Sequence, residues 1–122
     1  MASLPIGRAL PLACFLTALL GACVAHGDSS AGRASALATT VSRAVTCKAG
    51  SPQRATLDRF LAAEKARGAN EQQIAAARAA YIGVSEAETI NQGVRPQACT
   101  AEERAQLKEQ MGRIRAGDFN TL

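Results

Sequence analysis

The stretch CTAEERAQLKEQMGRIRAG, residues 99–117, decides the fold class of this chain. Thr100 followed three residues later by Glu103 has the pattern of a helix-capping box, and Gly117 is a typical helix stop. Between these signals the large apolar residues recur at helical spacing on one face: Leu107, Met111 and Ile114. The stretch therefore predicts an amphipathic helix that runs to about Arg115.

Similar start and stop signals divide the preceding residues. Ser51-Pro52 predicts the start of a helix that Gly68 ends, and Asn70 with Gln73 predicts a second helix that ends at Gly83. Ser85 with Glu88 predicts a short third helix that Gly93 stops. The apolar faces of the first two are narrow: Leu57, Phe60 and Leu61, then Ile74, Ala77 and Tyr81.

Composition agrees with an all-α fold. The chain has no Trp, one Tyr and three Phe, and it lacks the β-branched and aromatic runs from which sheets are built. Short helices of this kind are not stable alone and must pack together. We expect a small disulfide-stapled bundle of three to five short helices over residues 44–119. Leu37, Val41 and Val45 lie four apart, so a further helix before Cys47 remains open.

The N-terminal residues have the pattern of an export signal. Arg8 precedes an uncharged, mostly apolar run from Ala9 to Leu20, and small residues follow it. This run is shorter than the roughly 20 apolar residues that a membrane-spanning helix needs. The sequence therefore predicts a signal peptide over residues 1–23 and a protein that works outside the bacterial cytoplasm.

Leu20-Gly21-Ala22-Cys23 resembles the lipobox of bacterial lipoproteins. The resemblance implies cleavage before Cys23 and lipidation of that cysteine. We therefore expect a periplasmic protein that the lipid on Cys23 anchors to the outer membrane. The alternative is an ordinary signal-peptidase cut after Ala25 or Gly27. Residues 24–43 are rich in Ser, Ala, Gly and Thr, and this composition predicts a flexible tether.

Of the four cysteines, Cys14 leaves with the signal peptide and Cys23 is lipidated or removed. Cys47 and Cys99 remain as the candidates for a disulfide, which an oxidising compartment permits. Such a bridge is expected to join the regions before the first and the last helix of the domain. A disulfide adds considerably to the stability of a domain whose hydrophobic core is this small.

The segment Val94 to Thr100 with the helix after it, and Asp58-Arg59-Phe60-Leu61-Ala62, resemble periplasmic acid-stress chaperones of the HdeA/HdeB type. These are small, exported, all-α proteins with one disulfide. The resemblance implies that Cys47 and Cys99 form the structural bridge. This chain departs from the family by lacking its tryptophans, by its basic character, and by the residues Lys48 to Pro52 between the first cysteine and its helix.

The sequence offers little for catalysis. The one histidine, His26, lies beside the expected cleavage site, so the predicted domain has neither a histidine base nor an imidazole ligand. The acidic pairs Glu86/Glu88 and Glu102/Glu103 lie in predicted first helical turns, where carboxylates favour the helix dipole. We expect no enzyme activity, no metal and no cofactor. A net charge of +4 and few aromatic residues do not indicate nucleic acid.

Two further features are candidates for function. Glu64 falls inside the apolar stripe of its helix, where a buried carboxylate could sense acid. In the last helix a basic stripe borders two apolar residues, and such a seam could meet anionic lipid or an acidic partner: Arg104, Lys108, Arg115, Leu107 and Met111. We expect a non-enzymatic envelope protein that binds another envelope protein, such as a pilotin-like assembly factor, or alternatively a soluble acid-stress chaperone.

Overall fold

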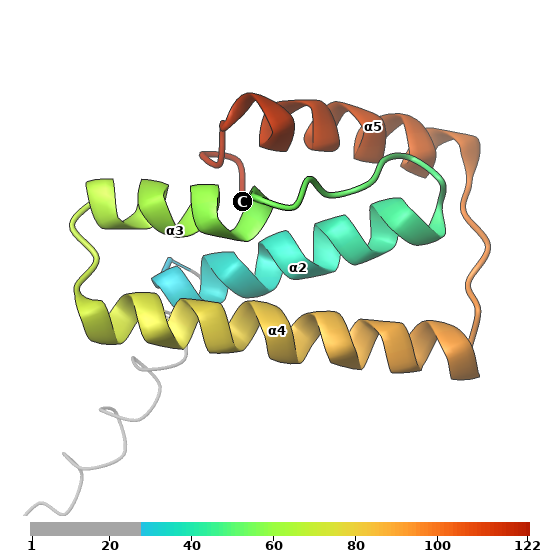
Figure 1. The fold of residues 1–122 in the computed structure, drawn as a ribbon. Coiled ribbons are helices and arrows are strands. Elements are labelled where there is room, and N and C mark those ends of the chain that lie inside the picture. The colour runs from blue at the N-terminus through green and yellow to red at the C-terminus, as the bar shows by residue number, and fades with distance from the viewer. Residues whose placement is uncertain (1–27) are drawn as a thin grey trace, which may run out of the picture.

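The structure, a computed structural model, describes residues 28–122, which form four α-helices (Figure 1). The helices are α2 (Ser30–Thr46), α3 (Thr56–Ala66), α4 (Glu71–Val94) and α5 (Ala101–Ala116). The predicted all-α fold with one disulfide is confirmed, since Cys47 is bonded to Cys99 with their Cα atoms 5.6 Å apart. The predicted signal peptide and Cys23 lie outside the described residues. Within residues 28–122, no helix has the length and apolar character needed to cross a membrane.

Helix α2 is the centre of the fold and lies between α4 and α5 (Figure 1). The sequence predicts a tether over residues 24–43, but residues 30–43 belong to this helix. The Ser29 side chain accepts a hydrogen bond from the N–H of Gly32 at its start. The many small residues of α2 resemble the composition of a linker. In the folded domain these small side chains let the neighbouring helices approach closely. The residues of the inner face of α2 are buried: Ala34, Leu37, Ala38, Val41 and Ala44.

Helix α3 begins later than expected. Ser51-Pro52 lies in the loop of residues 47–55, and the helix starts at Thr56, whose hydroxyl accepts a hydrogen bond from the N–H of Gln53. The predicted apolar face is confirmed, since Phe60 and Leu61 are buried. The Phe60 ring meets that of Phe119 edge to face, with centroids 5.5 Å apart.

Helix α4 is one continuous helix where the sequence predicts two. Its capping box of Asn70 and Gln73 is present as expected. Gly83 and Ser85, which were expected to end one helix and begin another, lie within it. A glycine inside a helix costs about 1 kcal/mol relative to alanine, and packing along α2 and α3 offsets that cost.

Helix α5 confirms its prediction. The Thr100 hydroxyl accepts a hydrogen bond from the N–H of Glu103, and Gly117 ends the helix at a φ of 81°. Cys47 caps the C-terminal end of α2, so the disulfide joins the end of α2 to the approach to α5. The sequence predicts instead that the bridge joins two helix starts, because it places no helix firmly before Cys47.

A buried ion pair ties α2 to α3. Arg33 Nε lies 2.8 Å from Glu64 Oε1, and the Ser30 hydroxyl donates to the other carboxylate oxygen of Glu64 at 2.8 Å. The same guanidinium donates through Nη2 to the carbonyl oxygen of Phe119, also at 2.8 Å. Both charged side chains therefore have partners within the core, as buried charges require.

Candidate binding site

The C-terminal half of α4 is the least covered apolar surface in residues 28–122. Helix α3 lies along its N-terminal half, whereas only α2 runs beside the C-terminal half (Figure 1). The exposed fraction is 46 % for Ile82 at the middle of α4, and 66 % for Ile90 and 72 % for Val94 along its C-terminal half. Val45, at the nearby end of α2, is 50 % exposed. Single exposed apolar residues are ordinary, but a group of four beside a groove marks a candidate contact surface.

A groove of about 480 Å³ lies between α2 and this half of α4. We call it the α2–α4 groove. Its floor is apolar and its edges carry hydroxyl, amide and carboxylate groups. The lining residues are Val41, Ser42, Val45, Thr46, Pro52, Tyr81, Ser85, Glu88, Thr89 and Gln92. An apolar cleft with a few polar groups is the usual character of a binding site for a ligand or peptide.

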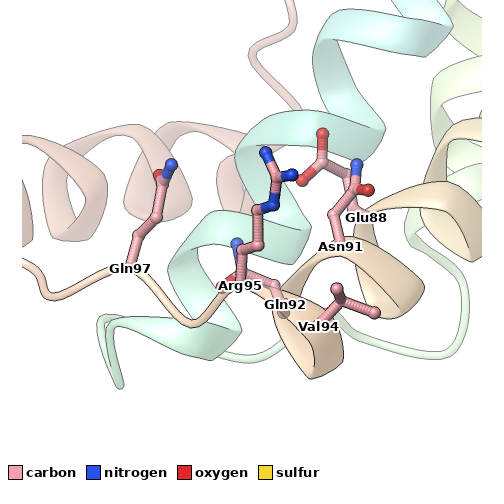
Figure 2. Close-up of a pocket in the computed structure, with 6 residues that line it drawn as sticks. All are labelled: Glu88, Asn91, Gln92, Val94, Arg95 and Gln97. Atoms are coloured by element: carbon pink, nitrogen blue, oxygen red, sulfur yellow. The ribbon is translucent and has the colours of Figure 1, made fainter.

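A second hollow of about 580 Å³ continues from the groove at the C-terminal end of α4 (Figure 2). Glu88 and Gln92 line both spaces. The Arg95 side chain points toward the same space as Glu88 (Figure 2). The Gln92 Oε1 atom is buried and has no hydrogen-bond partner among the described residues. It is an unused acceptor in the wall that the two hollows share.

Tyr81 gives the groove a protonated phenol. Burial of the ring raises its pKa above the ordinary value of 10.0, while Ser85 acts in the opposite direction. The hydroxyl therefore stays protonated at neutral pH and offers both a donor and an acceptor. It lies on the groove wall one turn before Ser85.

Of the predicted basic–apolar seam on α5, the structure leaves only the basic residues at the surface. Leu107 and Met111 are buried in the core, with 7 % and 1 % exposure, so they offer no surface to a partner. The basic residues Arg104, Lys108 and Arg115 are exposed. Arg104 Nε donates to the carbonyl oxygen of Cys47 at 3.0 Å, and Arg115 Nη2 donates to that of Ser51 at 3.4 Å.

Glu64 is buried as its position in the apolar stripe predicts, with 3 % exposure. It is not a lone carboxylate, because Arg33 and Ser30 both bond to it. The partner could not be identified from the local pattern, since Arg33 lies on a different helix. The structure therefore places Glu64 in the framework of the fold and away from the α2–α4 groove.

A second ion pair holds α5 against α2 beside the disulfide. Both Glu103 oxygens accept from the Arg43 guanidinium, which also reaches the carbonyl oxygens of Gln97 and Ala98. The hydrogen bond from Arg43 holds the pKa of Glu103 below its ordinary value. Cys47, Cys99 and Glu103 come close enough to resemble a metal-ligand cluster. The two sulfurs are bonded to each other, however, and are not thiolates.

The groove residues are the part of the surface that sequence reasoning missed. The predicted tether over residues 24–43 contained Val41, the helix through Val41 and Val45 was left open, and the expected break at Gly83 divided α4. The available signal was the apolar residues Ile82, Ile90 and Val94 outside every predicted core stripe. Comparisons of the chain with protein-family models, curated proteins and solved structures found no match.

Proposed function

We propose that this protein is a non-enzymatic, exported envelope protein that binds a segment of another envelope protein in the α2–α4 groove. The observation that carries the proposal is the apolar groove itself, together with two largely exposed residues of α4 at its edges: Val94 lines the adjoining hollow with Glu88 and Gln92, and Ile90 lines a shallow hollow with Ser85 and Thr89. The disulfide is consistent with a location outside the cytoplasm, because such bonds persist in oxidising compartments.

The groove chemistry describes the partner segment. Apolar side chains would cover Val41, Val45 and the exposed apolar residues of α4. Glu88 makes no ion pair among the described residues and would favour a Lys or Arg on the partner. An amphipathic segment with basic residues on one edge fits this surface.

The groove is tested with photo-crosslinking residues placed at positions 90 and 94 in living cells. Positions 75 and 79 are matched controls, because Ala75 and Ala79 are exposed on the N-terminal half of the same helix with the same spacing. We expect one adduct of defined mass from positions 90 and 94 that Ile82→Asp abolishes. Equal adducts from positions 75 and 79, or none from 90 and 94, would contradict the proposal.

The anchor is a separate part of the proposal. Lipidation of Cys23 predicts labelling with palmitate and partition into detergent, both lost in Cys23→Ser. An intact mass that places the N-terminus after Ala25 or Gly27 would show the soluble form instead. The groove proposal stands with either result, whereas a pilotin-like role needs the anchor.

The acid-stress chaperone is the second candidate, and one observation favours it. Glu103 joins α5 to α2 through Arg43, so its protonation would weaken the contact between these two helices. The test is suppression of client aggregation at about pH 2–3 and at neutral pH, with dye binding as the measure of exposed apolar surface. We expect loosening in acid with little protection of clients. Strong protection confined to low pH would favour the chaperone.

A further inference from the structure

The face formed by α5 and the loop of residues 47–55 carries cations without matching carboxylates. The loop runs along α5 (Figure 1), and contacts fix it there: Arg104 bonds to Cys47, and Arg115 bonds to Ser51. Arg59 Nη1 donates to both Gln53 Oε1 and the carbonyl oxygen of Arg115. We call this surface the basic face, and its residues are Lys48, Arg54, Arg59, Arg104, Lys108 and Arg115.

No residue of the basic face forms an ion pair with a carboxylate in residues 28–122. Elsewhere in this part of the chain, two cations, Arg67 and Arg95, are likewise unpaired, and five form such pairs: Arg33, Arg43, Lys65, Arg78 and Arg113. On α5 itself, Glu103 pairs with Arg43 and Glu109 with Arg113, whereas Glu102 forms no ion pair among the described residues. Asp58 pairs with Arg78, and Asp118 accepts from the N–H of Asn120. Positive potential is therefore concentrated on one side of the domain.

The extent and composition of the face select among anionic partners. Arg104 and Arg115 are eleven residues apart on one helix, which spans about 16 Å at 1.5 Å per residue, too wide for one small anion. Protein interfaces centre on aromatic and apolar anchors, but Leu107, Met111 and Ala49 beneath this face are buried. It also lacks an exposed aromatic ring on which nucleic-acid bases could stack. A flat array of phosphates fits these features best.

We infer that the basic face adsorbs the domain to an anionic phospholipid surface, with the arginines and lysines contacting headgroup phosphates. Guanidinium groups suit phosphate because their donors match its oxygens in pairs. Pro52, in the loop that carries Lys48 and Arg54, also lines the α2–α4 groove. The groove therefore opens beside the adsorbed face, where a partner held at the same membrane could reach it. Adsorption itself does not depend on the groove or on Cys23.

Binding of the exported, processed chain to vesicles tests the inference. Phosphatidylglycerol vesicles are compared with phosphatidylcholine vesicles of the same acyl chains, because a lipid anchor would bind both. Lys48→Gln/Arg54→Gln/Lys108→Gln removes three charges whose side chains form no hydrogen bond or ion pair among the described residues. Lys65→Gln/Arg67→Gln/Arg78→Gln removes three exposed charges from α3, α4 and their connection, two of them in surface ion pairs, and is the control with the same change in net charge.

We expect preference for phosphatidylglycerol, weakening as salt rises from about 0.05 M to about 0.3 M. The basic-face triple variant should bind about 100-fold more weakly, at about fivefold per charge, and the control should lose much less. Equal losses in the two triple variants, or no preference for phosphatidylglycerol, would overturn the inference. Tighter binding to polyglutamate or duplex DNA than to vesicles, or competition by inorganic phosphate at equal ionic strength, would also overturn it. A failure here leaves the crosslinking test of the groove unaffected.

Discussion

Arg33 on α2 and Glu64 on α3 form an ion pair 2.8 Å long whose side chains are only 7 % and 4 % exposed. The pair replaces apolar packing at the centre of the domain and joins two helices across 31 residues of chain. A buried pair of this kind need not stabilise more than apolar residues would, but it is costly to break from one side.

Replacing one partner of this ion pair is therefore expected to lower the free energy of unfolding far more than replacing both partners with apolar residues. Glu64→Ala leaves the Arg33 charge buried with the Phe119 carbonyl as its remaining partner, and the free energy of unfolding should fall by about 3–5 kcal/mol. Arg33→Met/Glu64→Leu should lose much less, because no charge remains unpaired. Urea denaturation of the three proteins measures this difference. A double variant as unstable as the single one would show that the pair itself supplies the stability.

The Arg43–Glu103 pair should make stability depend on acid. Arg43 lowers the folded pKa of Glu103 from 4.5, so its contribution is present above the unfolded pKa and is lost as pH falls through the folded pKa. The difference in Tm between wild type and Glu103→Gln should be largest near neutral pH and shrink well below pH 4.5. Glu109→Gln, which breaks an exposed pair within α5, is the control and should change Tm less. A difference that grows in acid would contradict this sign.

Reduction of the Cys47–Cys99 bond should destabilise the domain without changing its helical fold. The bond closes a loop of 52 residues that contains α3 and α4. In the chain-entropy model this is worth about 4 kcal/mol. Cys47→Ala/Cys99→Ala, followed by circular dichroism during heating, should reproduce the Tm of the reduced protein. An unchanged Tm after reduction would mean that the bridge adds little to the packed helices.

Gly117 should tolerate alanine less well than Gly68. Both have positive φ, 81° and 101°, where alanine is strained by roughly 1–2 kcal/mol. A Cβ at Gly117 would also lie 2.9 Å from Arg59 Nη2, whereas nothing lies within 4 Å at Gly68. Gly117→Ala should therefore lower stability more, and Arg59→Ala should make the two substitutions equivalent. Equal losses in the presence of Arg59 would show that its side chain moves away freely.

The sequence was informative where local signals act alone. The caps at Asn70 and Thr100 depend on residues three apart: the full box formed at Asn70 and Gln73, whereas at Thr100 only the hydroxyl cap formed, because the Glu103 carboxylate bonds to Arg43. The disulfide followed from the small number of cysteines left after the export signal. The apolar stripes of α3 and α5 followed from helical spacing, because large side chains at that spacing must be buried together.

Prediction failed where distant contacts decide the outcome. Helix α2 has the small residues of a linker, and only the packing of Ala34, Ala38 and Ala44 against other helices distinguishes it from one. Gly83 and Ser85 are stop and start signals that the packing of α4 overrides. Met111 sits between basic residues in the sequence, yet its side chain lies within 3.2 Å of the position a Cβ would take at Gly50. The α2–α4 groove could not be predicted for the same reason, because it exists only where the helix α2 packs beside the uninterrupted helix α4.

The pairing of Arg33 also sets an order of events in time. Synthesis runs from the N-terminus, so α2 exists before any helix that covers it, and Arg33 awaits Glu64, 31 residues later, and Phe119, 86 residues later. Of the four described helices, the central one is therefore the first to be made, and it is fully enclosed only at the end. Until α5 and the residues after it have emerged, the part of the α2 surface that α4 does not cover stays open to chaperones and proteases.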